Sequence, residues 1–306
     1  MSAQALRTGR RALLGLAAER PGAALAAALL GVIVIAVALA PLIAPQNPFD
    51  LASFDVLDAE LPPSWLQGSD KRFLLGTDAQ GRDLFSAILY GTRISLLVGV
   101  LAVAIQAAIG VPLGLLAGYV GGRTDSLVTR AADIQLSLST LMLAIIALAL
   151  FRAGLGGESL SHLAVPLLVL VIGLAEWPYF ARTARAATQV EATKDYVRAA
   201  RALGGSGPGV VWRHILPNIL SPLIVVGTTQ IAGAIMAEAA LSFLGLGMPV
   251  TKPSLGTLIR SGYDLIFAGA WWVTVIPGLV LIGLLVSVNL LGDALRDGLD
   301  PRLRPR

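Results

Sequence analysis

The sequence has no cysteine and little charge, and both features narrow what the protein can be. Without cysteine it cannot form a disulfide, a thiolate metal site or a cysteine nucleophile. Its two histidines, His162 and His214, are too few for a histidine-based site, so we expect no metal centre. Charged residues make up 14% of the chain, against about 25% in soluble domains, and 56% is hydrophobic. This composition cannot provide a polar surface for a folded protein, and it indicates a membrane protein with several spans.

The sequence also lacks the motifs of enzymes and of nucleotide-binding proteins. The phosphate-binding pattern GxxxxGK, followed by Ser or Thr, needs a lysine after glycine, and Lys71, Lys194 and Lys252 all follow other residues. The chain has no GxSxG or HExxH motif and no nucleophile beside an obvious base. We therefore expect no catalytic residue, no bound cofactor and no ATP hydrolysis by this chain itself.

Six apolar segments are long enough to cross about 30 Å of hydrocarbon. They cover 23–44, 93–120, 127–151, 163–181, 219–246 and 271–292. The first is longer than the roughly 7–15 apolar residues of a cleavable signal peptide, so we interpret it as a retained anchor. The predicted fold class is therefore all-α, an integral membrane protein with six transmembrane helices.

The positions of the arginines predict how these spans are oriented, because Lys and Arg favour cytoplasmic loops. Most of the 23 Lys and Arg residues lie at the two ends of the chain, in the loop between spans 2 and 3 and in the loop between spans 4 and 5. Both termini are therefore predicted to be cytoplasmic, as the segment 1–22 and the tail 296–306. The segment 45–92 would be extracytoplasmic, and 93–295 would form a core of five spans with a cytoplasmic loop at 182–218.

The extracytoplasmic segment 45–92 is rich in proline, aspartate and aromatic residues. Thr77 or Asp78 is a candidate helix N-cap within it. Leu84, Ile88 and Leu89 would then form the apolar face of a short interfacial helix that enters the second span. We prefer a lid or docking cap over the external mouth to the alternative of an ordinary ordered loop.

The loop between the fourth and fifth spans contains a candidate docking hairpin, YVRAARALGGSGPGVVWRHILPN, from Tyr196 to Asn218. Residues 193–203 favour a helix of about three turns with a face of small residues, and Gly204 would end it. A second short helix over about 209–216 would lead to the fifth span. Because the chain has no ATP-binding motif, this hairpin is its best docking surface for an energy-supplying subunit. The alternative is a basic loop that only fixes the orientation.

The hairpin resembles the EAA loop of type I ABC importer permeases, in which an EAA triplet is followed by xxxG and later by IxLP. Arg198 stands at the glutamate of the triplet and His214 at the first isoleucine. Both departures weaken the generic motif, but the peptide/nickel branch, which the hairpin resembles, commonly tolerates such variation. The resemblance implies that the hairpin fits a groove on an ATPase subunit. The residues assigned to this coupling are Tyr196, Arg198, Ala199, Ala200, Gly204, His214, Leu216 and Pro217.

The resemblance extends over nearly the whole chain. PLIAPQNPFD, PPSW and LGTDAQGRDLFSAILYGTRISL are similar to the first external region of the C-type permease subunit in the dipeptide, oligopeptide and nickel importers. AEAALSFLGLGMP and NLLGDALRDGLDPRLR are similar to its fifth span and C-terminus. Ser139 stands where relatives often carry proline, so the usual cause of a kink is missing from the third span.

The resemblance implies a permease subunit of an ATP-driven importer that moves di- or oligopeptides across a bacterial or archaeal cytoplasmic membrane by alternating access. The implied partners are a homologous second permease, two ATPase subunits that bind ATP and Mg, and an extracytoplasmic substrate-binding protein, with no role for nucleic acid. One alternative is an importer of nickel or another small substrate in the same family. Another is a gradient-driven secondary transporter.

Polar residues inside the predicted spans are candidates for a translocation path or gate, namely Glu238, Gln230 and Asn289. An ionised carboxylate at mid-helix costs at least ~2.5–3.5 kcal/mol, so Glu238 should face the bundle, a water-filled path or a partner. The alternative for Glu238 is a structural hydrogen-bond anchor, and for the two amides it is helix–helix contact.

Two further patterns concern helix packing. Gly110, Gly114 and Gly118 recur at a four-residue spacing that would let two helix backbones approach closely, although an alanine-rich sequence also produces such spacings by chance. Glu176 and Asp133 are expected near the cytoplasmic ends of their spans, either solvated or paired with arginine.

Overall fold

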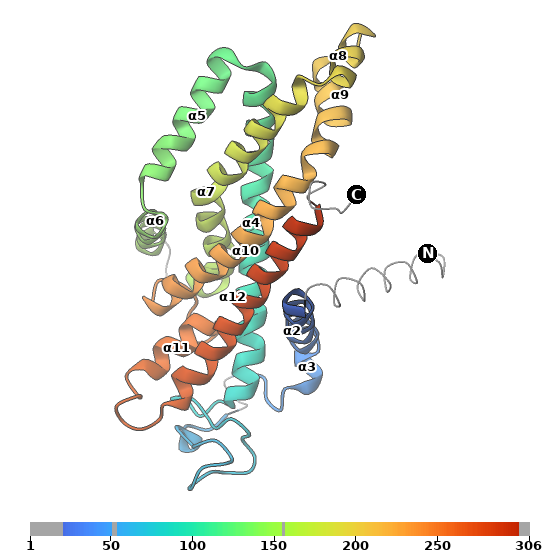
Figure 1. Ribbon diagram of the computed structural model, residues 1–306. Coiled ribbons are helices and arrows are strands. Elements are labelled where there is room, and N and C mark those ends of the chain that lie inside the picture. Colours follow the sequence, from blue (N-terminus) through green and yellow to red (C-terminus); the bar gives the residue numbers. More distant parts are fainter. Residues whose placement is uncertain (1–20, 51–53, 155–156, 300–306) are drawn as a thin grey trace. The chain divides into compact units, whose positions relative to one another are not determined.

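The computed structural model describes residues 21–50, 54–154 and 157–299, and within these ranges it consists of helices and loops, apart from one isolated bridge between Thr77 and Asp83 (Figure 1). This confirms the all-α fold class. The chain divides into two compact units. Unit 1 comprises Met1–Arg93 and Thr251–Arg306, and unit 2 comprises Ile94–Val250.

Four helices of the described residues are long and apolar enough to cross a membrane, and they match the second, fourth, fifth and sixth predicted spans. They are Leu84–Val120, Leu163–Ala192, Gly207–Phe243 and Trp272–Gly298. The first predicted span contains α2 (Pro21–Ala38) and α3 (Ala40–Ile43), whose apolar stretch is shorter than a spanning helix. The count of six spans and the cytoplasmic termini stay predictions, and residues 1–20 and 300–306 lie outside the described ranges.

The third predicted span, 127–151, is wrong as a single straight helix. It is divided between α5 (Gly122–Ser137) and α6 (Thr140–Gly154), with a bend of 83°. The chain is extended at Leu138, so a sharp bend occurs beside Ser139 without proline. The physical reason is that α5 is polar and pairs along α7 (Gly157–Ala192) through two ion pairs, Asp125–Arg185 and Asp133–Arg182.

In unit 2, the glycine stripe allows α4 (Leu84–Val120) to pack closely on α7. A Cβ atom added at Gly110, Gly114 or Gly118 would lie only 2.4, 2.4 or 2.7 Å from the α7 carbonyl oxygens of Trp177, Ala181 and Arg185, respectively. Such distances are well below van der Waals contact, so any larger residue would push the helices apart. The predicted close approach is therefore confirmed, and the two helices run parallel with a four-residue repeat on each side.

In unit 1, α12 (Trp272–Leu299) packs against both α2 and α11 (Leu255–Tyr263). The segment before α4, predicted to be extracytoplasmic, contains among its described residues one short 3₁₀ helix, η1 (Val56–Asp58), and these residues are otherwise loop from Gln46 to α4. The Trp272 indole Nε1 donates to the carbonyl oxygen of Thr77 at 3.3 Å, which fixes the loop to α12.

The start of α4 corrects the predicted N-cap. Asp83, not Thr77 or Asp78, precedes the helix, and its Oδ2 accepts from the Ser86 backbone N–H three residues later at 2.8 Å, as an N-cap does. Thr77 and Asp78 are buried in the preceding loop instead, and Asp78 Oδ2 lies 2.6 Å from the buried Arg82 guanidinium. Burial raises the pKa of the Asp83 carboxyl.

The apolar face predicted for this region is buried, as Leu84, Ile88 and Leu89 are all less than 8% exposed. These residues do not form a separate interfacial helix. They are the first turns of α4, which continues without a break to Val120.

Candidate functional site

The first arm of the hairpin is α8 (Asp195–Ala202), which lies inside the predicted helix 193–203. Val197 is its one fully buried residue among those described and attaches the arm to the core. Arg198 and Ala199 are exposed, and the Arg198 guanidinium lies 3.9 Å from a fully exposed Asp195 carboxylate. Exposed pairs of this kind contribute little stability, so both residues remain available to a partner.

Gly204 ends the first arm by a backbone mechanism. Its φ is +85°, and its N–H donates to the Arg201 carbonyl while the Gly205 N–H donates to that of Ala200, both at 3.0 Å. These two bonds define the Schellman motif, in which a left-handed residue closes the helix end. No described atom comes within 4 Å of a Cβ added at Gly204, so its constraint is conformational rather than spatial.

The second arm is not the separate short helix predicted at 209–216. It comprises α9 (Gly207–Val210) and η2 (Val211–Ile215), a π-helical turn, and runs directly into α10 (Leu216–Phe243) as one helix (Figure 1). Pro217 has no N–H, and its ring crowds the preceding turn of a regular α-helix. The wider π turn leaves room for the ring, and its hydrogen bond joins the Leu216 N–H to the Val211 carbonyl five residues earlier. The second arm and the fifth spanning helix are therefore mechanically continuous.

A cluster around the Tyr196 hydroxyl ties the two arms to α7. The hydroxyl donates to the Glu191 carboxylate at the end of α7 and accepts from Asn218 Nδ2 on α10 at 3.3 Å. Asn218 Nδ2 also donates to the His214 carbonyl at 2.7 Å, and Lys194 Nζ lies 2.7 Å from Glu191. We call Glu191, Lys194, Tyr196 and Asn218 the Tyr196 cluster. Burial, and then the bond to Glu191, raise the pKa of Tyr196 to about 12, so the hydroxyl keeps its proton at neutral pH.

A hollow of about 320 Å³ lies between the arms and is lined by apolar, small and cationic residues. These are Ala200, Leu203, Gly205, Ser206, Gly209, Val210, Arg213 and His214. Leu203 is 89% exposed at its edge. An exposed apolar side chain beside a hollow that Arg213 lines with positive charge is the chemistry of a protein-docking surface rather than of a catalytic site.

The structure distributes the eight predicted coupling residues over this hairpin. Ala200 and His214 line the hollow, and Arg198 and Ala199 lie on the exposed face of α8. Tyr196 bonds to Glu191 where the hairpin meets α7, and Gly204 forms the turn between the arms. Leu216 and Pro217 lie within the continuous second helix. Sequence reasoning missed the roles of Glu191 and Asn218, which lie five positions before and 22 positions after Tyr196 and meet its hydroxyl only in the folded chain.

Glu238 is fully buried in unit 2. Ser95 Oγ on α4 donates to its Oε2 at 2.7 Å, and Ser242 Oγ donates to its Oε1 at 2.6 Å. This arrangement favours the structural anchor between α4 and α10 that was the alternative reading of this residue. A gating role for Glu238 stays a prediction.

Gln230 belongs to a polar cluster between three helices. Its Nε2 donates to Gln106 Oε1 on α4 and to Glu176 Oε2 on α7, both at 3.2 Å. Glu176 therefore lies near the middle of α7, and its predicted place at a cytoplasmic helix end is wrong because α7 continues to Ala192. The arginine pairing expected of Asp133 is confirmed by its bond to Arg182. Asn289 lies in unit 1, exposed on α12, and its role in the path stays a prediction.

Comparisons with known proteins give one family. A sequence model of the family described as binding-protein-dependent transport system inner membrane component matches residues 110–305. The di/tripeptide transport system permease protein DppC of Pseudomonas aeruginosa is 40% identical over 272 residues, covering 89% of this chain and 85% of that protein. The dipeptide transport system permease protein DppC of Haemophilus influenzae is 39% identical and covers 90% of this chain and 91% of that protein. The corresponding protein of Escherichia coli is 40% identical and covers 89% of this chain and 87% of that protein.

Among solved structures, two inward-facing forms of the MetNI methionine ABC transporter contain a similar chain. One superposes with a TM-score of 0.56 at 18% identity and covers 70% of this chain and 96% of that chain. The other gives a TM-score of 0.54 at 19% identity, with coverage of 71% and 98%. At such identity the likeness concerns the fold, which is that of an ABC importer permease.

Proposed function

The chain belongs to the family of binding-protein-dependent transport system inner membrane components, and from this premise we propose that it is the permease subunit of an ATP-driven importer of di- or oligopeptides. It is a multi-pass protein of the bacterial cytoplasmic membrane. The exposed hairpin carries the proposal, because it offers a docking surface on a chain that has no ATP-binding motif of its own. Relatives of about 40% identity that are named as dipeptide permeases support peptides as the substrate.

The proposed partners are a homologous second permease, two ATPase subunits beneath the hairpins and an extracytoplasmic substrate-binding protein. ATP and Mg would bind to the ATPase subunits, so this chain transmits motion and is not itself an enzyme. The exposed cationic and apolar groups around the hollow support a protein partner at this surface.

The hairpin would transmit force through two rigid connections. Its second arm is continuous with α10, and the Tyr196 cluster fixes its first arm to α7 and α10. α7 is in turn locked against α4 along the glycine stripe. When ATP binding draws two ATPase subunits together, a displacement of the hairpin would therefore move α4, α7 and α10 as one body, which is the rocking motion that alternating access needs.

The proposal is tested by reconstituting the chain with its partner subunits in proteoliposomes and measuring uptake of a labelled dipeptide. We expect uptake that needs ATP and the binding protein, that unlabelled dipeptides compete away and that nickel does not. Competition by nickel alone would assign the chain to the nickel branch. Uptake by this chain alone, driven by an ion gradient, would refute the importer.

A further inference from the structure

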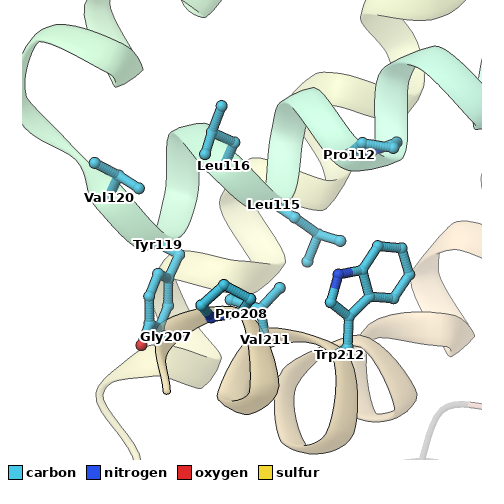
Figure 2. Close-up of a pocket in the computed structure, with 9 residues that line it drawn as sticks. All are labelled: Pro112, Leu115, Leu116, Tyr119, Val120, Gly207, Pro208, Val211 and Trp212. Carbon is cyan, nitrogen blue, oxygen red and sulfur yellow. The ribbon is translucent and has the colours of Figure 1, made fainter.

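A second cavity, of about 520 Å³, lies beside the hairpin within unit 2 (Figure 2). It lies between the last turns of α4 and the first turns of the second arm. Its lining residues are Pro112, Leu115, Leu116, Tyr119 and Val120 from α4, and Gly207, Pro208, Val211 and Trp212 from the arm. Figure 2 shows the Trp212 indole reaching toward Pro112 and Leu115, with Tyr119 and Pro208 grouped at the other end.

The wall of this cavity is apolar and open to its surroundings. Leu116, Val120 and Trp212 are 48%, 59% and 58% exposed, so a continuous apolar surface lacks a cover within the described chain. Exposed apolar patches of this kind mark binding surfaces. The neighbouring hollow between the arms presents Ser206, Arg213 and His214, whereas this cavity offers an occupant almost no hydrogen-bonding partner.

A cation stands at the edge of the cavity. The Arg201 guanidinium lies over the Tyr119 ring, 4.4 Å from its centroid, and Tyr119 is a lining residue. Within the described ranges, Arg201 forms no ion pair with a carboxylate. The edge therefore carries positive charge that an anion can neutralise.

The cavity lies between the ends of two helices that are long and apolar enough to cross a membrane. Its α4 wall consists of the last turns of Leu84–Val120, and its other wall consists of the first turns of Gly207–Phe243. Aromatic residues and arginines at a membrane boundary contact lipid headgroups, and basic pockets beside spanning helices bind anionic ones.

We infer that this cavity binds an acyl chain of an anionic phospholipid, whose phosphate is held by Arg201. The apolar wall takes the hydrocarbon, and the unpaired guanidinium at the edge selects the negative headgroup. Bound there, the lipid bridges α4 and the second arm of the hairpin. The inference rests on the proposed function only for the membrane location, and its test measures binding without transport, so the two can fail separately.

Trp212 provides the probe for this site. The full-length chain is placed in nanodiscs that contain phosphatidylcholine with a minor fraction of lipid brominated on its acyl chains, either phosphatidylglycerol or phosphatidylcholine. Bromine quenches tryptophan fluorescence on contact, and the difference between the wild type and Trp212→Phe isolates the signal of Trp212. We expect brominated phosphatidylglycerol to quench Trp212 at a several-fold lower mole fraction than brominated phosphatidylcholine.

Arginine variants test the headgroup contact. Arg201→Gln should abolish the preference for phosphatidylglycerol, and Arg201→Lys should keep most of it. Arg198→Gln, on the same helix but paired loosely with Asp195, should leave the preference unchanged. Equal quenching by the two lipids in the wild type would refute headgroup selection. Absence of quenching, or its loss when the ATPase subunits are added, would show that no lipid occupies the cavity in the transporter.

Discussion

Replacing Gly204 by valine should uncouple the hairpin while leaving the fold intact. The glycine has a φ of +85°, and an L-residue in the left-handed region costs roughly 1–2 kcal/mol. Relieving that strain would break one or both cap bonds, at about 0.5–1.5 kcal/mol each. Since about 1.4 kcal/mol is a factor of ten, the docking-competent conformation should become roughly ten-fold rarer or more. No described atom lies near the new side chain, so insertion into the membrane should be normal.

The assay is peptide-stimulated ATPase activity and dipeptide uptake by the complete transporter in proteoliposomes, with membrane levels measured in parallel. Gly204→Val should lose most of both activities. Gly204→Asn should retain most, because asparagine tolerates the left-handed region. Gly269→Val is the matched control, since Gly269 has a φ of +99° and open space but lies in unit 1. Normal stimulated ATPase activity in Gly204→Val, or an equal loss in Gly269→Val, would refute the reasoning.

Three further predictions concern the supports of the hairpin. Tyr196→Phe removes the hydrogen bond to the Glu191 carboxylate, which contributes about 1.5–3 kcal/mol. Because this bond connects the hairpin to α7, its loss should lower dipeptide uptake several-fold more than ATPase activity. An equal fall in both activities would argue against force transmission. Gly114→Ala should lower the Tm of the purified chain, because the new Cβ would lie 2.4 Å from the Ala181 carbonyl, whereas Gly233→Ala, with open space, should not. Tyr196 should ionise only near pH 12. Because the pKa of Tyr196 is higher in the folded than in the unfolded chain, the stability that it contributes is complete below about pH 10 and is lost as the pH rises through 12. A difference titration at 295 nm against Tyr196→Phe measures this pKa, and a midpoint near 10 would contradict the structure.

Local patterns in the sequence predicted the features that depend on neighbouring residues. The first arm and its glycine stop follow from helix propensity and backbone conformation within ten residues, and both are confirmed. The glycine stripe was also visible, because its spacing repeats along one helix. Its partner helix was not, since no local pattern identifies which backbone faces Gly114.

The errors arose where distant residues decide the local structure. The second arm was predicted as a separate short helix over about 209–216, but the π turn before Pro217 keeps it continuous with the spanning helix. The apolar content of 127–151 suggested one span, although the ion pairs of α5 with α7 and the bend beside Ser139 divide it. The Tyr196 cluster joins residues on three helices, so neither Glu191 nor Asn218 could be recognised from spacing alone.

The π turn at Val211–Ile215 also sets the direction in which the hairpin faces. A π turn holds one residue more than an α-helical turn, and each residue of an α-helix rotates the chain by about 100° and advances it by about 1.5 Å. Deleting one residue there would close the turn to α-helical width, so the Pro217 ring would crowd it and Arg213 and His214 would shift around and along the helix axis. The setting of these two side chains relative to α10 therefore depends on the one extra residue that the π turn holds.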